Sequence, residues 1–274
     1  MDAQLFDRLQ AQDAQIDGSL ARAALCDALV RGITGPDESA LEPFVDLEAF
    51  AALSDAGRVL EASGAYAGLG TRLDALRAAA VAEAARDSAP GALEADRQRL
   101  FGHTARGEAP PYETEYGALD SFRQSQELAD LGGFYSAFGL TVDRAFHERA
   151  DHVALELEFL LFLAGKEAYE RSAAHDDVVE QVLGAQKLFV RDHIGRFGRA
   201  FARSLSENAL HPFHKALGEL CSVFLDGESK RLGLPAGPEW IALRPENDYD
   251  VPMACGNCPL PGNANGGEPD DEDA

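Results

Sequence analysis

One short segment, 148–159, holds the residues that are best suited to chemistry. It reads Glu-Arg-Ala-Asp-His-Val-Ala-Leu-Glu-Leu-Glu-Phe and combines four carboxylates with one imidazole. On a helix, Glu148, His152 and Glu156 would stand four residues apart in one column, and Asp151 would lie in a neighbouring column. Because buried carboxylates are costly unless a cation or hydrogen-bond donors satisfy them, this cluster requires a partner.

The residue types leave three kinds of partner open. The first is structural, with ion pairs to arginines of the same chain, for which Arg149, Arg144 and Arg123 are candidates. The second is a metal ion, although di-iron bundles use Glu-x-x-His on two helices, whereas here the Glu-to-His spacing is four and has no second copy. The third is an external arginine, whose planar guanidinium matches carboxylates at two points.

The overall charge narrows the class of function. The 274 residues include 24 basic and 47 acidic side chains, a net charge of −23, which disfavours binding to nucleic acid or anionic lipid. No apolar run reaches the ~20 residues of a membrane span. The first twenty residues contain four aspartates and no apolar signal core, so we predict a cytoplasmic protein. The acidity reflects either salt adaptation or base composition of the genome, or a surface that attracts a basic peptide.

The spacing of apolar residues predicts an all-α fold, a single helical bundle without strands. Within the segment 153–164 nearly every position is apolar, which is typical of a helix in the centre of a bundle. Gly139 followed by Leu140 predicts a left-handed helix end. We expect helices at 2–16, 19–31, 38–55, 71–88, 91–101, 118–138, 144–171, 175–206 and 212–232.

The chain divides into a helical domain, 1–244, and a tail, 245–274. No basic residue follows Arg244, and the tail carries eight acids together with many glycines, asparagines and prolines. Such a composition buries too little apolar surface to fold alone, so we predict a flexible acidic tail.

The four cysteines are too few for a disulfide framework. Cys26 and Cys221 lie among apolar residues and are expected to be small core residues. Cys255-Gly-Asn-Cys258 in the tail has metal-site spacing, but no second pair is nearby, so a weak metal pair and an incidental pair both remain open. We find neither a phosphate-binding glycine loop nor a Ser-His-Asp arrangement, and no cofactor is predicted.

Three segments resemble the TorD/DmsD/NarJ family of cytoplasmic chaperones, which mature molybdenum oxidoreductases. They are the acidic segment 148–159, the loop 110–117 (Pro-Pro-Tyr-Glu-Thr-Glu-Tyr-Gly) and the helix 127–140 (Glu-Leu-Ala-Asp-Leu-Gly-Gly-Phe-Tyr-Ser-Ala-Phe-Gly-Leu). The sequences of these segments most resemble the branch of the family that serves type II dimethyl-sulfoxide-reductase-like enzymes. Ala150 departs from the family, in which many members have proline before the Asp-His pair, and the first hundred residues carry no matching motif.

The resemblance implies a chaperone rather than an enzyme. Such a chaperone binds the twin-arginine signal peptide of an apo catalytic subunit and delays export until the cofactor is inserted. The signal offers two arginines followed by an apolar stretch, so acidic and aromatic side chains are the expected contacts. The predicted peptide-binding residues are Tyr112, Glu115, Tyr116, Phe134, Glu148, Asp151, His152, Glu156 and Phe159.

Several roles stay open within this hypothesis. His152 either orients Asp151, makes the site sensitive to pH, or is a buried structural histidine. Tyr112 and Tyr116 either line the groove or fasten their loop to the bundle. The hypothesis requires that acids near the start of the central helix remain available to an incoming arginine pair. Two other functions are a metal-dependent helical-bundle oxidoreductase that uses Glu148, His152 and Glu156, and a structural subunit of a redox complex.

Overall fold

The structure is a computed structural model, which describes residues 3–35, 40–85, 91–102, 106–117, 121–143 and 148–245. Within these ranges every regular element is a helix, and extended pairing is limited to three isolated bridges. The prediction of an all-α fold is therefore confirmed. Met1–Arg244 forms one compact unit. The pair Cys255 and Cys258 lies outside the described residues.

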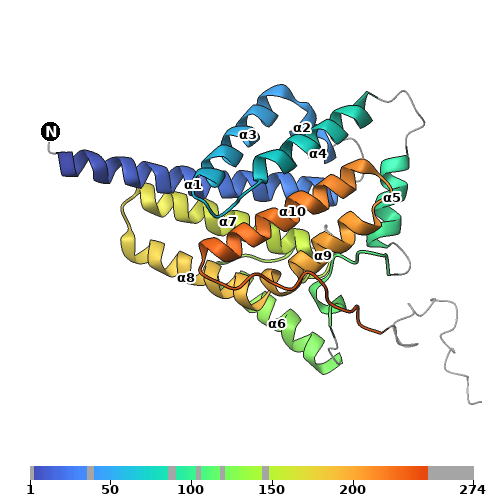
Figure 1. Cartoon of the computed structure of the whole chain (residues 1–274). Helices are drawn as coiled ribbons and strands as arrows, with labels where there is room; N and C mark the ends of the chain where they lie inside the picture. Colours follow the sequence, from blue (N-terminus) through green and yellow to red (C-terminus); the bar gives the residue numbers. More distant parts are fainter. Residues whose placement is uncertain are drawn as a thin grey trace, which may run out of the picture. The chain divides into compact units, whose positions relative to one another are not determined.

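The described residues form α-helices of different lengths and one short 3₁₀ helix, which Figure 1 shows in chain order by colour. None of the helices in the described ranges combines the length and the apolar character that a membrane crossing needs. The elements are α1 (Ala3–Thr34), α2 (Glu42–Val45), α3 (Leu47–Ala62), α4 (Leu69–Ala84), α5 (Ala92–Phe101), η2 (Glu113–Glu115), α6 (Ser121–Ala137), α7 (Val153–Ser172), α8 (Asp176–Asp192), α9 (Ile194–Asn208) and α10 (Pro212–Arg231).

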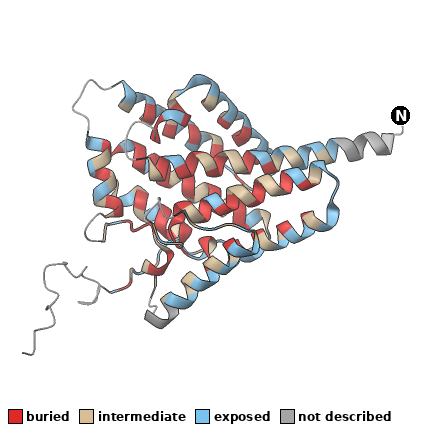
Figure 2. Cartoon of the chain, turned by 180° about the vertical axis from the view of Figure 1, so that it is seen from behind, coloured by how far each residue is buried: buried red, intermediate tan, exposed pale blue. Residues whose placement is uncertain are grey.

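Helix α7 packs against α1, α8 and α9, and α10 packs against α9, α4 and α1. This confirms the central position predicted from the apolar segment 153–164. Figure 2 shows the buried residues on the faces that these helices turn toward one another. The apolar residues at helical spacing in α9 and α10 are buried as their periodicity indicates, among them Phe197, Phe201, Phe213 and Phe224.

Several predicted helix boundaries are wrong. The helix expected at 38–55 is divided at Asp46 into α2 and α3, and α3 continues to Ala62. Helix α1 runs through Gly18 as one helix where we expected two, because packing against α7 and α3 outweighs the roughly 1 kcal/mol that an interior glycine costs. Conversely, the expected helix 175–206 breaks at His193, whose φ of −124° and ψ of −105° are not helical. A Cβ on the neighbouring Gly195 would lie 2.2 Å from the carbonyl oxygen of Val190, so the break requires a residue without a side chain.

The predicted left-handed end after α6 is confirmed. Gly139 has a φ of +72°, a value that glycine adopts without the steric cost of a Cβ. The backbone N–H of Leu140 donates to the carbonyl oxygen of Tyr135 at 2.9 Å, and Leu140 packs against the core. The chain therefore turns at Gly139, and the residue after it, Leu140, returns to the core.

A buried ionic network joins α1, α7 and α10. Arg22 contacts Glu167 and lies 3.8 Å from Glu228, and Arg231 lies 2.6 Å from Glu228. The Tyr66 hydroxyl also donates to Glu228. Each of these buried carboxylates has cationic and hydrogen-bond partners from the same chain, as burial of a charge requires.

After α10 the chain crosses beside the loop that carries η2, and this segment, 241–244, is called the strap below. The backbone N–H of Gly117 donates to the carbonyl oxygen of Ala242 at 2.9 Å. The backbone N–H of Arg244 donates to the carbonyl oxygen of Glu115 at 2.8 Å. The strap thus holds one side of the loop 106–117, and α7 holds the other.

Candidate functional site

Helix α7 begins at Val153, not at 144 as predicted, and residues 144–147 lie outside the described residues. His152 is extended, with φ −73° and ψ 130°, and forms an antiparallel bridge with Tyr112. The N–H of Val153 also donates to the carbonyl oxygen of Pro111 at 2.7 Å. Because the loop takes up these backbone groups, residues 148–152 are not helical. The expected column of Glu148, His152 and Glu156 on one helix is therefore wrong.

Asp151 is fully buried and satisfied by its own chain. Its carboxylate accepts hydrogen bonds from Arg149 at 2.8 and 2.9 Å and from the N–H and hydroxyl of Thr114 at 3.1 and 2.8 Å. Burial alone would raise the pKa of Asp151, but the Arg149 guanidinium and the Thr114 bonds lower the pKa below its usual range. Of the three kinds of partner considered for the acidic segment, Asp151 therefore has the structural one, an ion pair with an arginine of the same chain, Arg149.

The Tyr112 ring contacts both Arg149 of this ion pair and His152. The Arg149 guanidinium lies 4.2 Å from the centre of the Tyr112 ring, and the His152 ring packs edge-on at 5.3 Å. The Tyr112 hydroxyl donates to the Glu148 carboxylate, and both residues are half-buried. The contact between Tyr112 and Glu148 joins the loop 106–117 to the segment before α7.

His152 forms the cap of α7. Its Nδ1 accepts a hydrogen bond from the N–H of Ala154 at 3.1 Å, a role usually taken by Ser, Thr, Asp or Asn. Burial lowers the pKa of His152 to about 4, so the ring is neutral at pH 7 and suited to accept this bond. Of the three roles considered for His152, the geometry corresponds to that of a buried structural histidine.

Glu156 contrasts with Asp151 in its surroundings. It is fully buried within α7, and neither of its carboxylate oxygens has a hydrogen-bond partner in the part of the chain that the structure describes. Burial and the nearby Glu113 carboxylate raise the pKa of Glu156 well above its usual value. The neutral form of Glu156 is therefore favoured more than in an exposed glutamate, and the side chain does not reach the surface.

Glu113 and His193 form a second buried cluster. The Nδ1 of His193 lies 3.1 Å from Glu113 Oε2, and the Nε2 lies 3.2 Å from Asp130 Oδ2. Burial lowers the pKa of His193, but the bond to Glu113 and the charges of Glu113 and Asp130 raise it above its ordinary value. Burial raises the pKa of Glu113 more than the contact with His193 lowers it.

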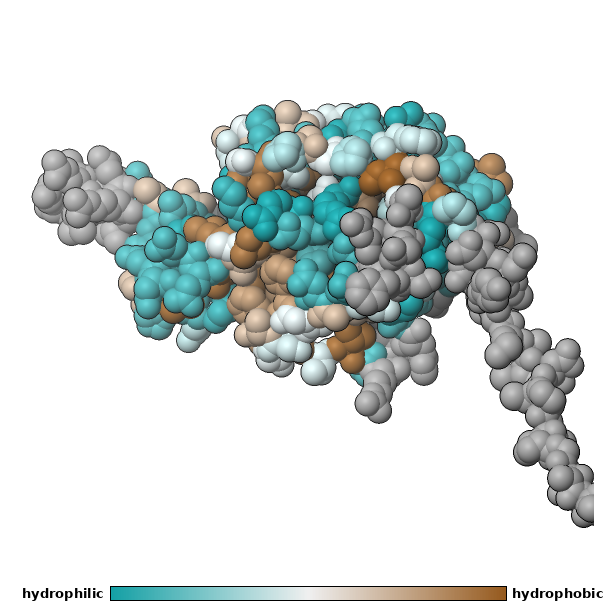
Figure 3. Space-filling model, turned by 90° about the horizontal axis from the view of Figure 1, so that it is seen from below, coloured by the Kyte–Doolittle hydropathy of each residue, from teal (hydrophilic) through white to brown (hydrophobic). Residues whose placement is uncertain are grey.

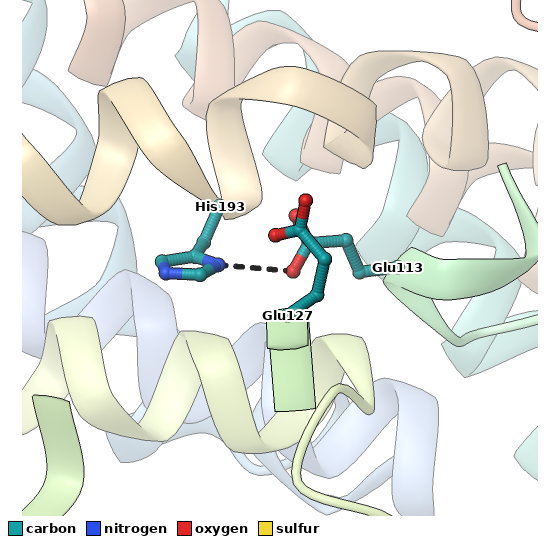
Figure 4. A group of neighbouring side chains, drawn as sticks. All are labelled: Glu113, Glu127 and His193. Atoms are coloured by element: carbon teal, nitrogen blue, oxygen red, sulfur yellow. Dashed lines mark hydrogen bonds and ion pairs between the residues drawn. The ribbon is translucent and has the colours of Figure 1, made fainter. Parts of the chain in front are cut away.

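Glu127 of α6 completes this group, which Figure 4 shows with Glu113 and His193 turned toward one another. The guanidinium of Arg196 lies 3.1 Å from Glu127 and 3.7 Å from Glu113. Glu113, Glu127, Asp130, His193 and Arg196 are here called the η2–α6 cluster. They were not predicted as site residues, because they come from separate elements and share no local spacing. The only signal was Glu113 within the loop 110–117 and Glu127 and Asp130 within the segment 127–140, both of which carried the family resemblance.

Glu115 and Tyr116 hold the loop in place. Glu115 lies between three arginines, at 3.4 Å from Arg106, 3.7 Å from Arg149 and 3.8 Å from Arg244. Tyr116 is buried, and its hydroxyl donates to the carbonyl oxygen of Pro110 at 3.0 Å. Its position therefore corresponds to the alternative that Tyr116 fastens the loop to the bundle.

The predicted aromatic residues Phe134 and Phe159 belong to one wall between α6, α7 and α8. Their ring centres lie 6.4 Å apart, and Phe189 contacts both rings. Phe159 is buried, whereas Phe134 and Phe138 are half-buried. The Phe134 ring also packs edge-on against the His193 ring at 5.3 Å. The apolar wall and the η2–α6 cluster are therefore continuous.

Two hollows in the described residues lie elsewhere. A cavity of about 310 Å³ is lined by residues of α1, α2 and α3, and one of about 490 Å³ by residues of α5 and the start of α10. Neither includes a residue predicted to bind the peptide. The metal ligands considered earlier, Glu148, His152 and Glu156, also do not converge, since among the described residues the group with metal-ligand spacing is Glu113, Glu127 and His193.

Comparison with known proteins gives a consistent picture. Residues 63–203 match the family model of the nitrate reductase delta subunit. The chain is 29% identical to chaperone protein TorD of Photobacterium profundum over 142 residues, which are 51% of this chain and 63% of that protein. It is 25% identical to TorD of Aliivibrio salmonicida over 147 residues, 54% of this chain and 67% of that protein. For TorD of Vibrio cholerae (strain M66-2) the identity is 28%, over 51% of this chain and 62% of the relative.

Proposed function

This chain belongs to the nitrate reductase delta subunit family, and on that premise we propose that it is a maturation chaperone for a redox enzyme. Family membership confirms the predicted resemblance to TorD/DmsD/NarJ proteins. The proposed client is the apo catalytic subunit of a molybdenum oxidoreductase together with its twin-arginine leader. Binding in the cytoplasm would delay export until the cofactor is in place, and the chain would act by binding rather than by catalysis.

We further propose the branch that serves type II dimethyl-sulfoxide-reductase-like enzymes. The amino-acid sequences of the segments 110–117 and 148–159 support this assignment, because they resemble that branch. The matched region covers less than two thirds of the Photobacterium chaperone, so the client is inferred from the residues of this chain and not transferred from that protein.

The observation that best supports leader binding is the composition of α6. Glu127 and Asp130 lie on this helix before the half-buried Phe134 and Phe138, so acidic groups are followed by an apolar face. The Asp130 side chain is 64% exposed. A twin-arginine leader has the complementary order, with two guanidinium groups followed by an apolar stretch. Figure 3, seen from the side on which α6 and α8 lie, shows hydrophobic areas among hydrophilic residues.

The roles of the predicted residues are revised within this proposal. Asp151 and Glu156 are both buried and therefore are not assigned to direct contact with the leader. Asp151, which accepts hydrogen bonds from Thr114, is assigned to positioning the loop. Glu148, which is half-buried beside Tyr112, remains a candidate contact for a guanidinium group. Phe159 packs against Phe134 and is buried, so it lies too deep to contact the leader directly.

Leader binding is tested by titrating the full chain, in the presence of a chelator, with a synthetic twin-arginine leader and with the same peptide carrying Lys-Lys. We expect the Lys-Lys peptide to bind about tenfold or more weakly, because lysine lacks the planar two-point contact. Asp130→Asn should weaken binding of the arginine peptide and reduce its salt dependence. Glu180→Gln, which removes an exposed acid on α8, is the matched control and should not change binding.

Equal binding of both peptides, or binding that Asp130→Asn leaves unchanged, would contradict this contact surface. Recovery of the tagged chain with a large client that still carries its leader would support the chaperone function. Recovery with a fully matured enzyme would instead favour a structural subunit.

A further inference from the structure

We propose that Glu113, Glu127 and His193 form a binding site for one divalent transition-metal ion, with zinc as the probe of choice. Two carboxylates and one imidazole are a donor set that first-row divalent ions accept. One ligand atom from each residue lies within 4.8 Å of the other two. The three side chains point toward a common centre (Figure 4).

The distances suit coordination after a small closure. His193 Nδ1 and Glu113 Oε2 are 3.1 Å apart. With metal bonds of about 2.0–2.2 Å, neighbouring ligand atoms lie about 3.0–3.5 Å apart. Glu127 stands on α6 and Glu113 on η2, so the third ligand reaches the centre through a shift of one exposed helix.

Asp130 lies beside the imidazole, where metal-bound histidines usually have an acidic neighbour. Its Oδ2 lies 3.2 Å from His193 Nε2, but these atoms are not aligned for a hydrogen bond, and Nε2 has no hydrogen-bond partner among the described residues. Without a metal, Nδ1 and Glu113 Oε2 share one proton across 3.1 Å. A metal ion bound at Nδ1 would move that proton to Nε2, on the side where Asp130 stands.

Two buried polar atoms of the cluster favour an additional cation. Glu113 and His193 are both buried, and neither Glu113 Oε1 nor His193 Nε2 has a hydrogen-bond partner among the described residues. The contact between His193 and Glu113 uses Oε2 and leaves Oε1 without a donor. A divalent ion held by the Glu113 carboxylate would satisfy this buried oxygen.

Arg196 is the competitor for the same position. Its Nη1 lies 3.1 Å from Glu127 and 3.7 Å from Glu113, which demonstrates that this place favours a positive charge. The side chain is 46% exposed, so it can withdraw into solvent when a divalent ion enters. A bound ion would connect η2, α6 and the junction of α8 and α9.

The experiment uses the full chain with Cys255→Ser and Cys258→Ser, so that the tail thiols cannot bind zinc. After treatment with a chelator, zinc is titrated by calorimetry and the bound metal is counted by elemental analysis. We expect one zinc ion per chain, with a Kd of about 1 µM or tighter. Glu113→Gln and His193→Gln should each weaken binding about a hundredfold, and Asp130→Asn about tenfold.

His175→Gln is the matched control, because His175 also contacts a glutamate, Glu170 at 2.8 Å, but is exposed and remote from the cluster. It should leave zinc binding unchanged. Asp130 is exposed, so Asp130→Asn keeps the test valid if the buried variants fail to fold. No zinc in the cysteine-free chain, or equal affinity in the parent and Asp130→Asn, would overturn the proposal. The leader titration contains a chelator, so its outcome is independent of this one.

Discussion

Asp151 and Glu156 are two fully buried carboxylates near the start of α7, yet their surroundings differ completely. Asp151 accepts four hydrogen bonds from Arg149 and Thr114, and its pKa is lowered. Glu156 accepts none, and burial raises its pKa. The loop 106–117 and the segment before α7 supply donors on one side only. Proximity in sequence therefore does not tell which acid is charged.

Two groups of charged residues beside the loop 106–117, Asp151 with Arg149 and the η2–α6 cluster, differ in a similar way. Around Asp151 the charges are balanced by Arg149 from the same chain. In the η2–α6 cluster, Glu113, Glu127 and Asp130 share one arginine, Arg196, and a histidine. The first cluster holds the loop to α7, and the second is the place where we propose that an external cation binds. The predictions below test this difference.

The largest effect is expected for Arg149→Met, which leaves the Asp151 carboxylate buried with Thr114 as its remaining partner. Loss of one member of a buried pair costs about 3–5 kcal/mol, and because Arg149 is half-exposed we expect about 2–3 kcal/mol in urea unfolding. Adding Asp151→Asn should restore part of the loss. Arg58→Met, at an exposed pair with Asp55, should cost less than about 1 kcal/mol. A loss of similar size at both positions would contradict the assigned role of Asp151.

Asp151→Asn should lower the free energy of unfolding by about 1–3 kcal/mol at pH 7, because the charged acceptor is lost. The folded pKa of Asp151 is lowered, so its stabilising contribution is present above the unfolded pKa and disappears as pH falls through the folded pKa. The difference between the parent and Asp151→Asn should therefore shrink as urea unfolding is measured from pH 7 toward pH 3. A difference that stays constant would exclude a charged Asp151.

Glu156→Gln should have the opposite pH dependence. The folded pKa of Glu156 is raised, so stability is lost as pH rises from the unfolded pKa through the folded one. Each unit of pKa difference corresponds to about 1.4 kcal/mol. In the presence of a chelator, Glu156→Gln should match the parent in unfolding free energy near pH 4.5 and exceed it at pH 8. A variant that is less stable at pH 8 would indicate that Glu156 is ionised.

The smallest effect at pH 7 is expected for the cap of α7. His152→Ala removes the acceptor for the Ala154 N–H and should cost about 1 kcal/mol, whereas His152→Asn keeps an acceptor and should cost less. Because the folded pKa of His152 is lowered to about 4, its neutral form is favoured on folding, and this contribution is lost as pH falls from about 6.5 toward 4. Thermal unfolding of both variants across this range would measure it.

The sequence was sufficient for those parts of the molecule that depend on local pattern. The all-α class, the central position of α7 and the cap at Gly139 follow from periodicity and from the special conformation of glycine. The start of α7 was misplaced because pairing between His152 and Tyr112 is a long-range contact that helical periodicity does not contain. Periodicity also did not reveal the break at His193, which follows from backbone geometry.

The candidate site was predicted in part. Tyr112 and Glu148 were named as members of one peptide-binding set, and the structure places them in contact with each other, while their role in binding stays a prediction. The η2–α6 cluster was missed because Glu113 and His193 are 80 residues apart and approach only in the folded chain. Which of the buried acids is neutral also depends on tertiary contacts, so residue types and spacing alone could not separate Asp151 from Glu156.

The strap across the loop 106–117 is held by backbone atoms at Ala242 and Arg244. Since these bonds do not depend on which side chains are present, replacements at the exposed Ala242 should be tolerated. Insertions and deletions are a different matter, because one residue more or less after α10 would move Leu243 out of register with Tyr116. The length of this connection, rather than its composition, should therefore be what related chains hold constant.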